Sequence, residues 1–179
     1  MDGTNQQQTK EKEMTVTLEE IENYHNILLD ENGKEEQLQA QRKRLTDSIY
    51  STIDSGVAPD DDHIAEIAAA MQKDIQLRDF MLGLPSERKI EDVNTYLAYF
   101  VDSVPNEFFA PVGSVLAANL YSLEQTDSAK ELLAKVQVAD PRYSLANLLH
   151  RVFYSGWPAS AFTTMTEELH PKVKEGMGI

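Results

Sequence analysis

Three consecutive carboxylates and a histidine, Asp60, Asp61, Asp62 and His63, form the polar cluster with the most obvious chemical potential. Carboxylate and imidazole groups can hold a divalent cation. However, adjacent residues at the start of a helix rarely converge on one ion, whereas acidic side chains in a first turn favour the helix macrodipole. We therefore interpret the cluster as a helix start, and we expect no metal site.

The four histidines lie at positions 25, 63, 150 and 170, without the His-Glu-x-x-His spacing of a metal-binding helix. The sequence contains no Gly-x-Ser-x-Gly turn, no glycine-rich phosphate loop and no cysteine. It therefore predicts neither a catalytic centre nor a cofactor, and we expect a protein that is not an enzyme.

One candidate for acid–base chemistry is a cation flanked by two carboxylates, formed by Asp74, Arg78 and Asp79. Asp74 and Arg78 are four residues apart, which is the spacing of an ordinary ion pair on a helix surface. We expect that pair, and no catalysis.

Aromatic and basic side chains gather near the C-terminal end and are the candidates for a binding surface. A lone tryptophan at a sharp turn can instead be a core anchor whose indole N–H bonds a carbonyl oxygen. Both interpretations stay open here. The candidate partner-binding residues are Tyr143, His150, Arg151, Tyr154 and Trp157.

The charge is strongly negative: 179 residues carry 16 Lys and Arg against 30 Asp and Glu, for a net charge of −14. Residues 1–100 hold 10 basic and 21 acidic side chains, net −11, so this part of the chain carries most of the negative charge. Direct nucleic-acid binding needs basic side chains for the phosphates and is not expected. No run of about 18 apolar residues is present, so we expect no membrane contact and a cytoplasmic location.

Apolar residues recur at helical spacing, and no segment alternates with period two, so the sequence predicts an all-α fold. Thr17 and Glu20 form a capping box, and Gly56 is placed to end a helix with positive φ. We expect seven or eight helices in antiparallel pairs, as a bundle or a short stack. They span about 17–30, 34–54, 60–83, 85–104, 107–123, 127–138, 142–155 and 158–169. His170-Pro171 is expected to end the last one.

We expect three parts: a disordered tail over residues 1–14, one helical domain over 15–172 and a flexible tail over 173–179. Within the domain, residues 108–141 resemble one tetratricopeptide helical hairpin. Its small and apolar signature positions are occupied by Leu116, Ala117, Leu120, Ala129, Leu133 and Val136.

A wider resemblance covers about residues 64–160. The matching residues are Asp74, Arg78, Asp79, Asp127, Ala129, Asp140, Pro141, Tyr143, Ser144, Leu145, Ala146, Gly156 and Pro158. These segments resemble the C-terminal helical half of an actinobacterial and phage family named domain of unknown function 4192, and the acidic segment before residue 64 lies outside the likeness. The resemblance implies an all-α fold and a bacterial or phage origin, and it implies no activity.

Our leading hypothesis is a helical adaptor or inhibitor that binds a protein through a groove between paired helices. The alternative is an acidic mimic of a phosphate backbone that blocks a nucleic-acid-binding protein. A homodimer is permitted, because Leu38, Leu45, Ile49 and Ile53 form a stripe that can pair with a second copy.

Overall fold

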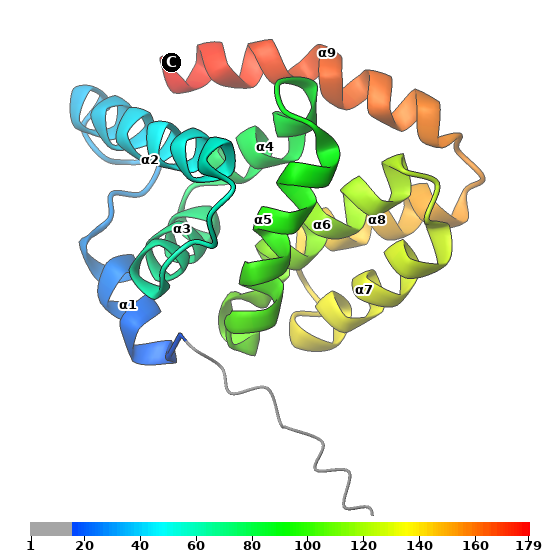
Figure 1. Ribbon diagram of the computed structural model, residues 1–179, viewed down its shortest axis with the longest axis horizontal. Coiled ribbons are helices and arrows are strands. Elements are labelled where there is room, and N and C mark those ends of the chain that lie inside the picture. The colour runs from blue at the N-terminus through cyan, green and yellow to red at the C-terminus, as the bar shows by residue number, and fades with distance from the viewer. Residues whose placement is uncertain (1–15) are drawn as a thin grey trace, which may run out of the picture.

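The computed structural model describes residues 16–179, and all regular secondary structure in that range is helical. The prediction of an all-α fold is confirmed, with nine α-helices and two 3₁₀ helices among these residues (Figure 1). Residues 1–14, where we expect disorder, lie outside the described range. The elements are α1 (Leu18–Ile27), α2 (Glu35–Ser55), α3 (Asp61–Lys73), α4 (Ile75–Gly83), η1 (Leu84–Ser86), α5 (Ile90–Ser103), η2 (Asn106–Phe108), α6 (Phe109–Ser122), α7 (Thr126–Ala139), α8 (Ser144–Tyr154) and α9 (Ala159–Met177).

Two predicted helix-end signals, the capping box at Thr17 and Glu20 and the C-terminal Gly56, are confirmed, whereas the first helix ends at Ile27, earlier than the predicted 30. The Thr17 hydroxyl accepts the Glu20 N–H at 3.2 Å, and the Glu20 carboxylate accepts the Thr17 N–H at 2.9 Å, which completes the capping box. Gly56 ends α2 in the left-handed region, with φ of 66°. Asp60 caps α3 by accepting the His63 N–H at 2.8 Å.

The apolar series from residue 61 to Gly83 forms two helices rather than one, which raises the helix number above the expected eight. The break lies at Asp74, whose backbone is extended, with φ −125° and ψ 103°. Asp74 ends α3 and also caps α4, because its carboxylate accepts the Gln76 N–H at 3.1 Å. Helical periodicity continues across the break, so the apolar pattern alone does not reveal it.

Buried apolar side chains from all nine α-helices form one hydrophobic core, with α6 at its centre. Twelve of the fourteen residues of α6 are buried, and α6 contacts α3, α4, α5, α7, α8 and α9. The stripe Leu38, Leu45, Ile49 and Ile53 is also buried inside the chain, so it is not free to pair with a second copy. In the described part of the chain, no helix has both the length and the apolar character that crossing a membrane requires.

Helices α6 and α7 pack closely against each other. A β-carbon on Gly113 would lie 2.6 Å from Val136 Cγ2 and 3.0 Å from Phe109 Cε1, so the two backbones can approach only because residue 113 has no side chain. Leu133, Ala129 and Val136 are fully or almost fully buried at this contact, as the tetratricopeptide-like pattern predicts.

The last helix corrects our expectation at the C-terminus. We expect His170-Pro171 to end the helix and residues 173–179 to form a flexible tail, but α9 continues through Pro171 to Met177. Tertiary contacts outweigh the missing proline N–H: His170 and Met177 are buried, and Gly178 ends the helix with φ of 76° beside Gln39 of α2. In Figure 1, α9 crosses the top of the molecule from the side of α8 to the side of α2.

We predict that Gly113→Val lowers the free energy of unfolding by about 2–4 kcal/mol, because the added methyl groups overlap Val136 and Phe109. Urea unfolding monitored by circular dichroism measures the change. Ala134→Val, on the exposed side of α7, is the matched control and should cost less than about 1 kcal/mol in helix propensity. Equal losses of unfolding free energy in the two variants would contradict the close approach of α6 and α7 at Gly113.

Candidate functional site

A buried ion pair joins α2 to the break between α3 and α4. Arg42 donates from Nε and from its second terminal nitrogen to the two oxygens of Asp74, at 2.7 and 2.9 Å. Only 8% of the Arg42 side chain and 3% of the Asp74 side chain are exposed. The expected surface pair between Asp74 and Arg78 is therefore wrong, because the Asp74 carboxylate is buried and bonds to Arg42 of α2.

Arg78 connects α4 to the start of α8. It donates to one oxygen of Asp79 at 3.0 and 2.8 Å, and its remaining terminal nitrogen lies 3.4 Å from the Tyr143 hydroxyl. The guanidinium carbon lies 5.8 Å from the centre of the Tyr143 ring. Burial raises the pKa of the Tyr143 phenol, so this group stays protonated at neutral pH. One stretch of the family-like pattern contains Arg78 and the other contains Tyr143, and this contact brings the two stretches together.

Residues of four helices, α2, α4, α8 and α9, line an open groove of about 930 Å³. Leu38 and Arg42 of α2 lie on one side, α4 forms the floor, and α8 and α9 complete the walls. Three large aliphatic side chains in the groove are unusually accessible: Ile75 is 48% exposed, Leu148 is 46% exposed and Leu169 is 46% exposed. Further apolar lining comes from Leu82, Leu145, Met165 and Val173.

The groove is lined mainly by apolar, charged and amide side chains. Its described lining residues include no histidine, cysteine, serine or tyrosine, and Arg42 and Arg78 are already held by carboxylates. A second, more open hollow of about 620 Å³ lies between α5 and α7 and includes Val138, which is 84% exposed.

The five predicted partner-binding residues do not form one surface. Tyr143 precedes α8 and contacts Arg78, whereas the others lie at the far end of α8 and beyond. There, the His150 ring stacks on the Tyr154 ring with centres 4.5 Å apart, and Lys130 of α7 lies over Tyr154 at 4.3 Å.

Arg151 is exposed on the same end of α8, and Trp157 follows in the turn. The Trp157 residue is 41% exposed, and its backbone carbonyl, not its indole, bonds to the core by accepting from the Tyr121 hydroxyl. Trp157 is therefore a surface residue, in a turn that is held to the core by its backbone carbonyl.

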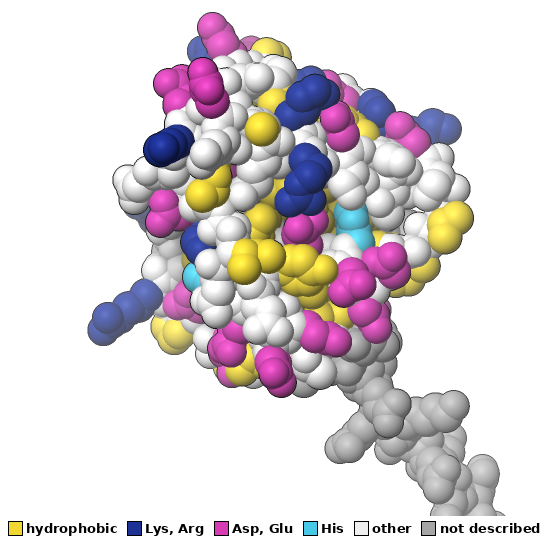
Figure 2. All heavy atoms as spheres, turned by 90° about the vertical axis from the view of Figure 1, so that its left-hand side faces the viewer, with side chains coloured by type: hydrophobic (Ala, Val, Ile, Leu, Met, Phe, Trp, Pro, Cys, Tyr) yellow, Lys and Arg dark blue, Asp and Glu magenta, His cyan; other side chains and the backbone are white. Residues whose placement is uncertain are grey.

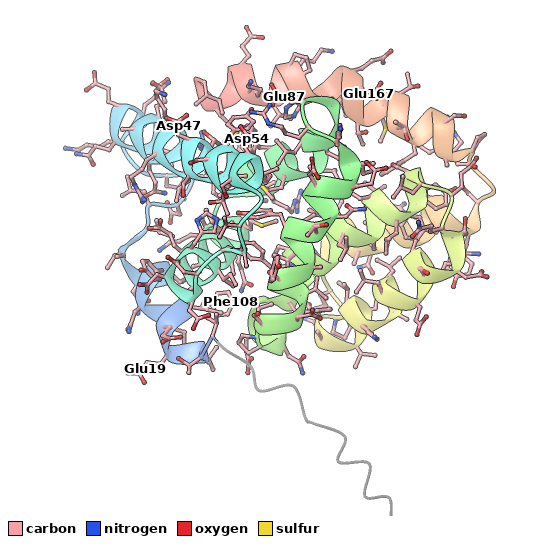
Figure 3. The ribbon with its side chains drawn as sticks, viewed as in Figure 1. Glu19, Asp47, Asp54, Glu87, Phe108 and Glu167 are labelled. Atoms are coloured by element: carbon pink, nitrogen blue, oxygen red, sulfur yellow. The ribbon has the colours of Figure 1, made fainter. Side chains whose placement is uncertain are left out.

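A polar cluster that the sequence analysis missed centres on Glu87, between the end of α2 and α9 (Figure 3). Glu87 accepts hydrogen bonds from the Tyr50 hydroxyl and, at 2.8 Å, from Lys174, and His170 Nε2 lies 3.0 Å from it. The partners are 37, 83 and 87 residues away, so no local spacing could have indicated the cluster. Next to it, Gly83 leaves room for the His170 ring, which a β-carbon would strike.

Hydrogen bonding and burial shift the pKa values of two groups in this cluster. Burial alone would raise the pKa of Glu87, but the hydrogen bonds from His170, Lys174 and Tyr50 lower it to about 2. Burial and the hydrogen bond to Glu87 raise the pKa of Tyr50 to about 12. At neutral pH the carboxylate stays charged and the phenol stays protonated, and the contacts of Glu87 with His170 and Lys174 connect α9 to this cluster.

The carboxylate cluster at residues 60–62 acts as a helix start. His63 lies beneath it, with Nδ1 3.2 Å from Ser48 Oγ and Nε2 2.7 Å from the hydroxyl of the buried Tyr96. Burial lowers the pKa of His63. Within residues 16–179, no group of three or more His, Cys, Asp or Glu is arranged to hold a metal ion.

Comparison with known protein families gives a match over most of the chain. A family model described as a domain of unknown function, DUF4192, matches residues 2–160. The match includes α1 and α2, so the acidic N-terminal segment is part of the family pattern and not outside it. No curated protein and no solved structure matches the chain.

We predict that Arg42→Ala lowers the free energy of unfolding by about 3–5 kcal/mol, because Asp74 is left buried without its cation. Arg44→Ala is the matched control. Its pair with Glu66 is more than half exposed on the arginine side, and its loss should cost about 0–1 kcal/mol. Urea unfolding measures both variants, and similar costs would contradict the structural role of the buried pair.

The Glu87 cluster predicts a pH dependence. A carboxylate whose pKa is lowered to about 2 on folding stabilises the fold above its ordinary pKa, and this contribution is lost as the pH falls towards 2. Glu87 is 28% exposed, so solvent screening reduces the contribution to about 1–2 kcal/mol.

We therefore expect Glu87→Gln to be less stable than the parent chain at pH 7, with the difference shrinking between pH 4.5 and 3. Urea unfolding across this range tests it. Glu168→Gln, an exposed position on α9, should show no such difference. A Glu87→Gln deficit that stays constant with pH would contradict the assignment.

Proposed function

Because the chain belongs to the DUF4192 family, whose function is unknown, we propose its role from geometry: a non-enzymatic helical module that binds a protein partner, as an adaptor or inhibitor. The binding site in this proposal is the groove between α2, α4, α8 and α9.

The accessible aliphatic side chains of the groove carry the proposal. Ile75, Leu148 and Leu169 come from three different helices and open into one hollow. Burying about half of a leucine side chain on binding contributes on the order of 1 kcal/mol, and such anchors dominate interface energies when they sit in a pocket. Helix-in-groove recognition uses the same arrangement of apolar side chains in a hollow.

The far end of α8 supports a partner site less well. His150, Tyr154 and Lys130 are stacked on one another, so part of their surface is already satisfied within the chain. Tyr143 is engaged by Arg78 beside the groove. In the proposal, Tyr143 helps to position the groove, and Arg151 and Trp157 lie outside it.

Acidic mimicry of nucleic acid has less support than groove binding. On the face shown in Figure 2, acidic side chains are interspersed with basic and apolar ones. Several carboxylates are neutralised locally, as in the ion pairs Lys43–Asp47, Arg44–Glu66 and Arg88–Asp54. A phosphate-backbone mimic calls for an uninterrupted acidic surface, and its binding would fall steeply with salt.

We expect the double substitution Leu148→Asp and Leu169→Asp to weaken partner binding at least tenfold, because charged groups replace two apolar anchors. Tagged chains are used to capture partners from native lysate at low and high salt, with quantification by mass spectrometry. Circular dichroism verifies that the exposed substitutions leave the fold intact.

Val138→Asp is the matched control, since it places the same charge in the hollow between α5 and α7. Two outcomes would contradict binding in the proposed groove: the double variant still binds the partner, or the Val138→Asp variant loses it instead. A partner that binds nucleic acid and is released by salt from all variants would favour mimicry.

A further inference from the structure

The groove has two chemically different ends. Towards α8 it is apolar, because Leu145 and Leu148 of α8 and Met165 and Leu169 of α9 line it there. Towards the start of α2 it is lined by the carboxylates of Glu31 and Glu35 and by polar Gln39 and Gln76. A ligand that fills the groove therefore meets apolar side chains of α8 and α9 at one end, and carboxylates beside Ile75 at the other.

Contacts fix the position of the acidic end. Glu31 accepts the N–H of Ile75 at 3.1 Å, which holds its carboxylate at the first residue of α4. A β-carbon on Gly176 would lie 3.3 Å from Gln76 Oε1, so the end of α9 lies against the same turn.

The length of the groove follows from α9, which forms one wall. Its lining residues extend from Met165 near the apolar end to Gly176 near the acidic end. At 1.5 Å per residue, these eleven steps correspond to about 17 Å, or three turns of a helix laid alongside.

The remaining charges sharpen the contrast between the ends. Arg42 and Arg78 are neutralised by Asp74 and Asp79. Among the described residues, no ion pair holds Glu31, Glu35 or Lys172. Two negative charges thus lie at the α2 end, and Lys172 contributes one positive charge on the wall of α9.

We propose that the groove binds a helical segment of about three turns in one orientation: its apolar side chains lie at the α8 end, and a lysine or arginine lies at Glu31 and Glu35. This rests on the proposed function and adds the chemical class and direction of the partner segment. Charges at the rim of an apolar site fix register and orientation, which is the role of the two carboxylates here.

The test selects ligands from a random 14-residue peptide library displayed on phage, using the full chain as bait. Peptides that also bind the Leu148→Asp, Leu169→Asp variant are removed. Enriched peptides are expected to share two large apolar residues one turn apart, and a lysine or arginine two or three turns away on the same helix face.

The affinity of an enriched synthetic peptide is then measured by titration calorimetry on two double variants. Glu31→Gln with Glu35→Gln should weaken binding about five- to twenty-fold and reduce its salt dependence, while the amide oxygen can still accept the Ile75 N–H. Glu19→Gln with Glu36→Gln is the matched control, with the same change in net charge outside the groove; Figure 3 shows Glu19 on α1 at the opposite end of the molecule from α9. It should leave affinity unchanged.

Two results would overturn the proposal, and they differ. Apolar peptides without a common basic residue, bound equally by the Glu31/Glu35 variant, would remove the orientation and leave the groove as a binding site. A library with no peptide sensitive to Leu148→Asp and Leu169→Asp would remove the groove itself, and with it the proposed function.

Discussion

The buried pair between Arg42 and Asp74 is the constraint on which the other features of the site depend. A charge taken out of water is costly unless a partner of opposite sign meets it with good geometry, and here two hydrogen bonds do so. Asp74 can cap α4 inside the protein only because Arg42 balances its charge. The pair therefore fixes the angle at the α3–α4 break and keeps α2 against it, which gives the groove one of its walls.

The core and the groove use different kinds of contact. Around α6, small residues such as Gly113 allow helices to approach until apolar side chains interlock. Around the groove, long polar side chains tie helix ends together: Arg78 holds the start of α8, and Glu87 holds α9. These polar interactions hold the helices around the groove at a defined spacing, so an apolar hollow remains open between them. Close packing of the helices would have filled it.

Sequence patterns within one or two helical turns predict most of the fold. Contacts between residues that are far apart in the sequence cannot be derived from a single sequence. The Thr17–Glu20 capping box, Gly56 and the buried positions of α6 and α7 follow from spacing within one or two turns. The break at Asp74 does not, because its cause is an arginine 32 residues away. The same applies to α9, where a proline argued for a stop and distant contacts carried the helix onward. For the groove, Asp74, Arg78 and Tyr143 stood out in the sequence, but its exposed aliphatic residues became recognisable only when four helices were brought together.

The long separation between Glu87 and Lys174 has a consequence for the order in which the chain folds. Contacts between residues 87 apart in sequence form late, because closing so long a loop is entropically costly before other contacts support it. During synthesis, the carboxylate of Glu87 and the backbone at Gly83 lack these contacts until α9 has left the ribosome. Until then the nascent protein presents an uncovered face on α4, and the wall of the groove formed by α9 is the final one to be built.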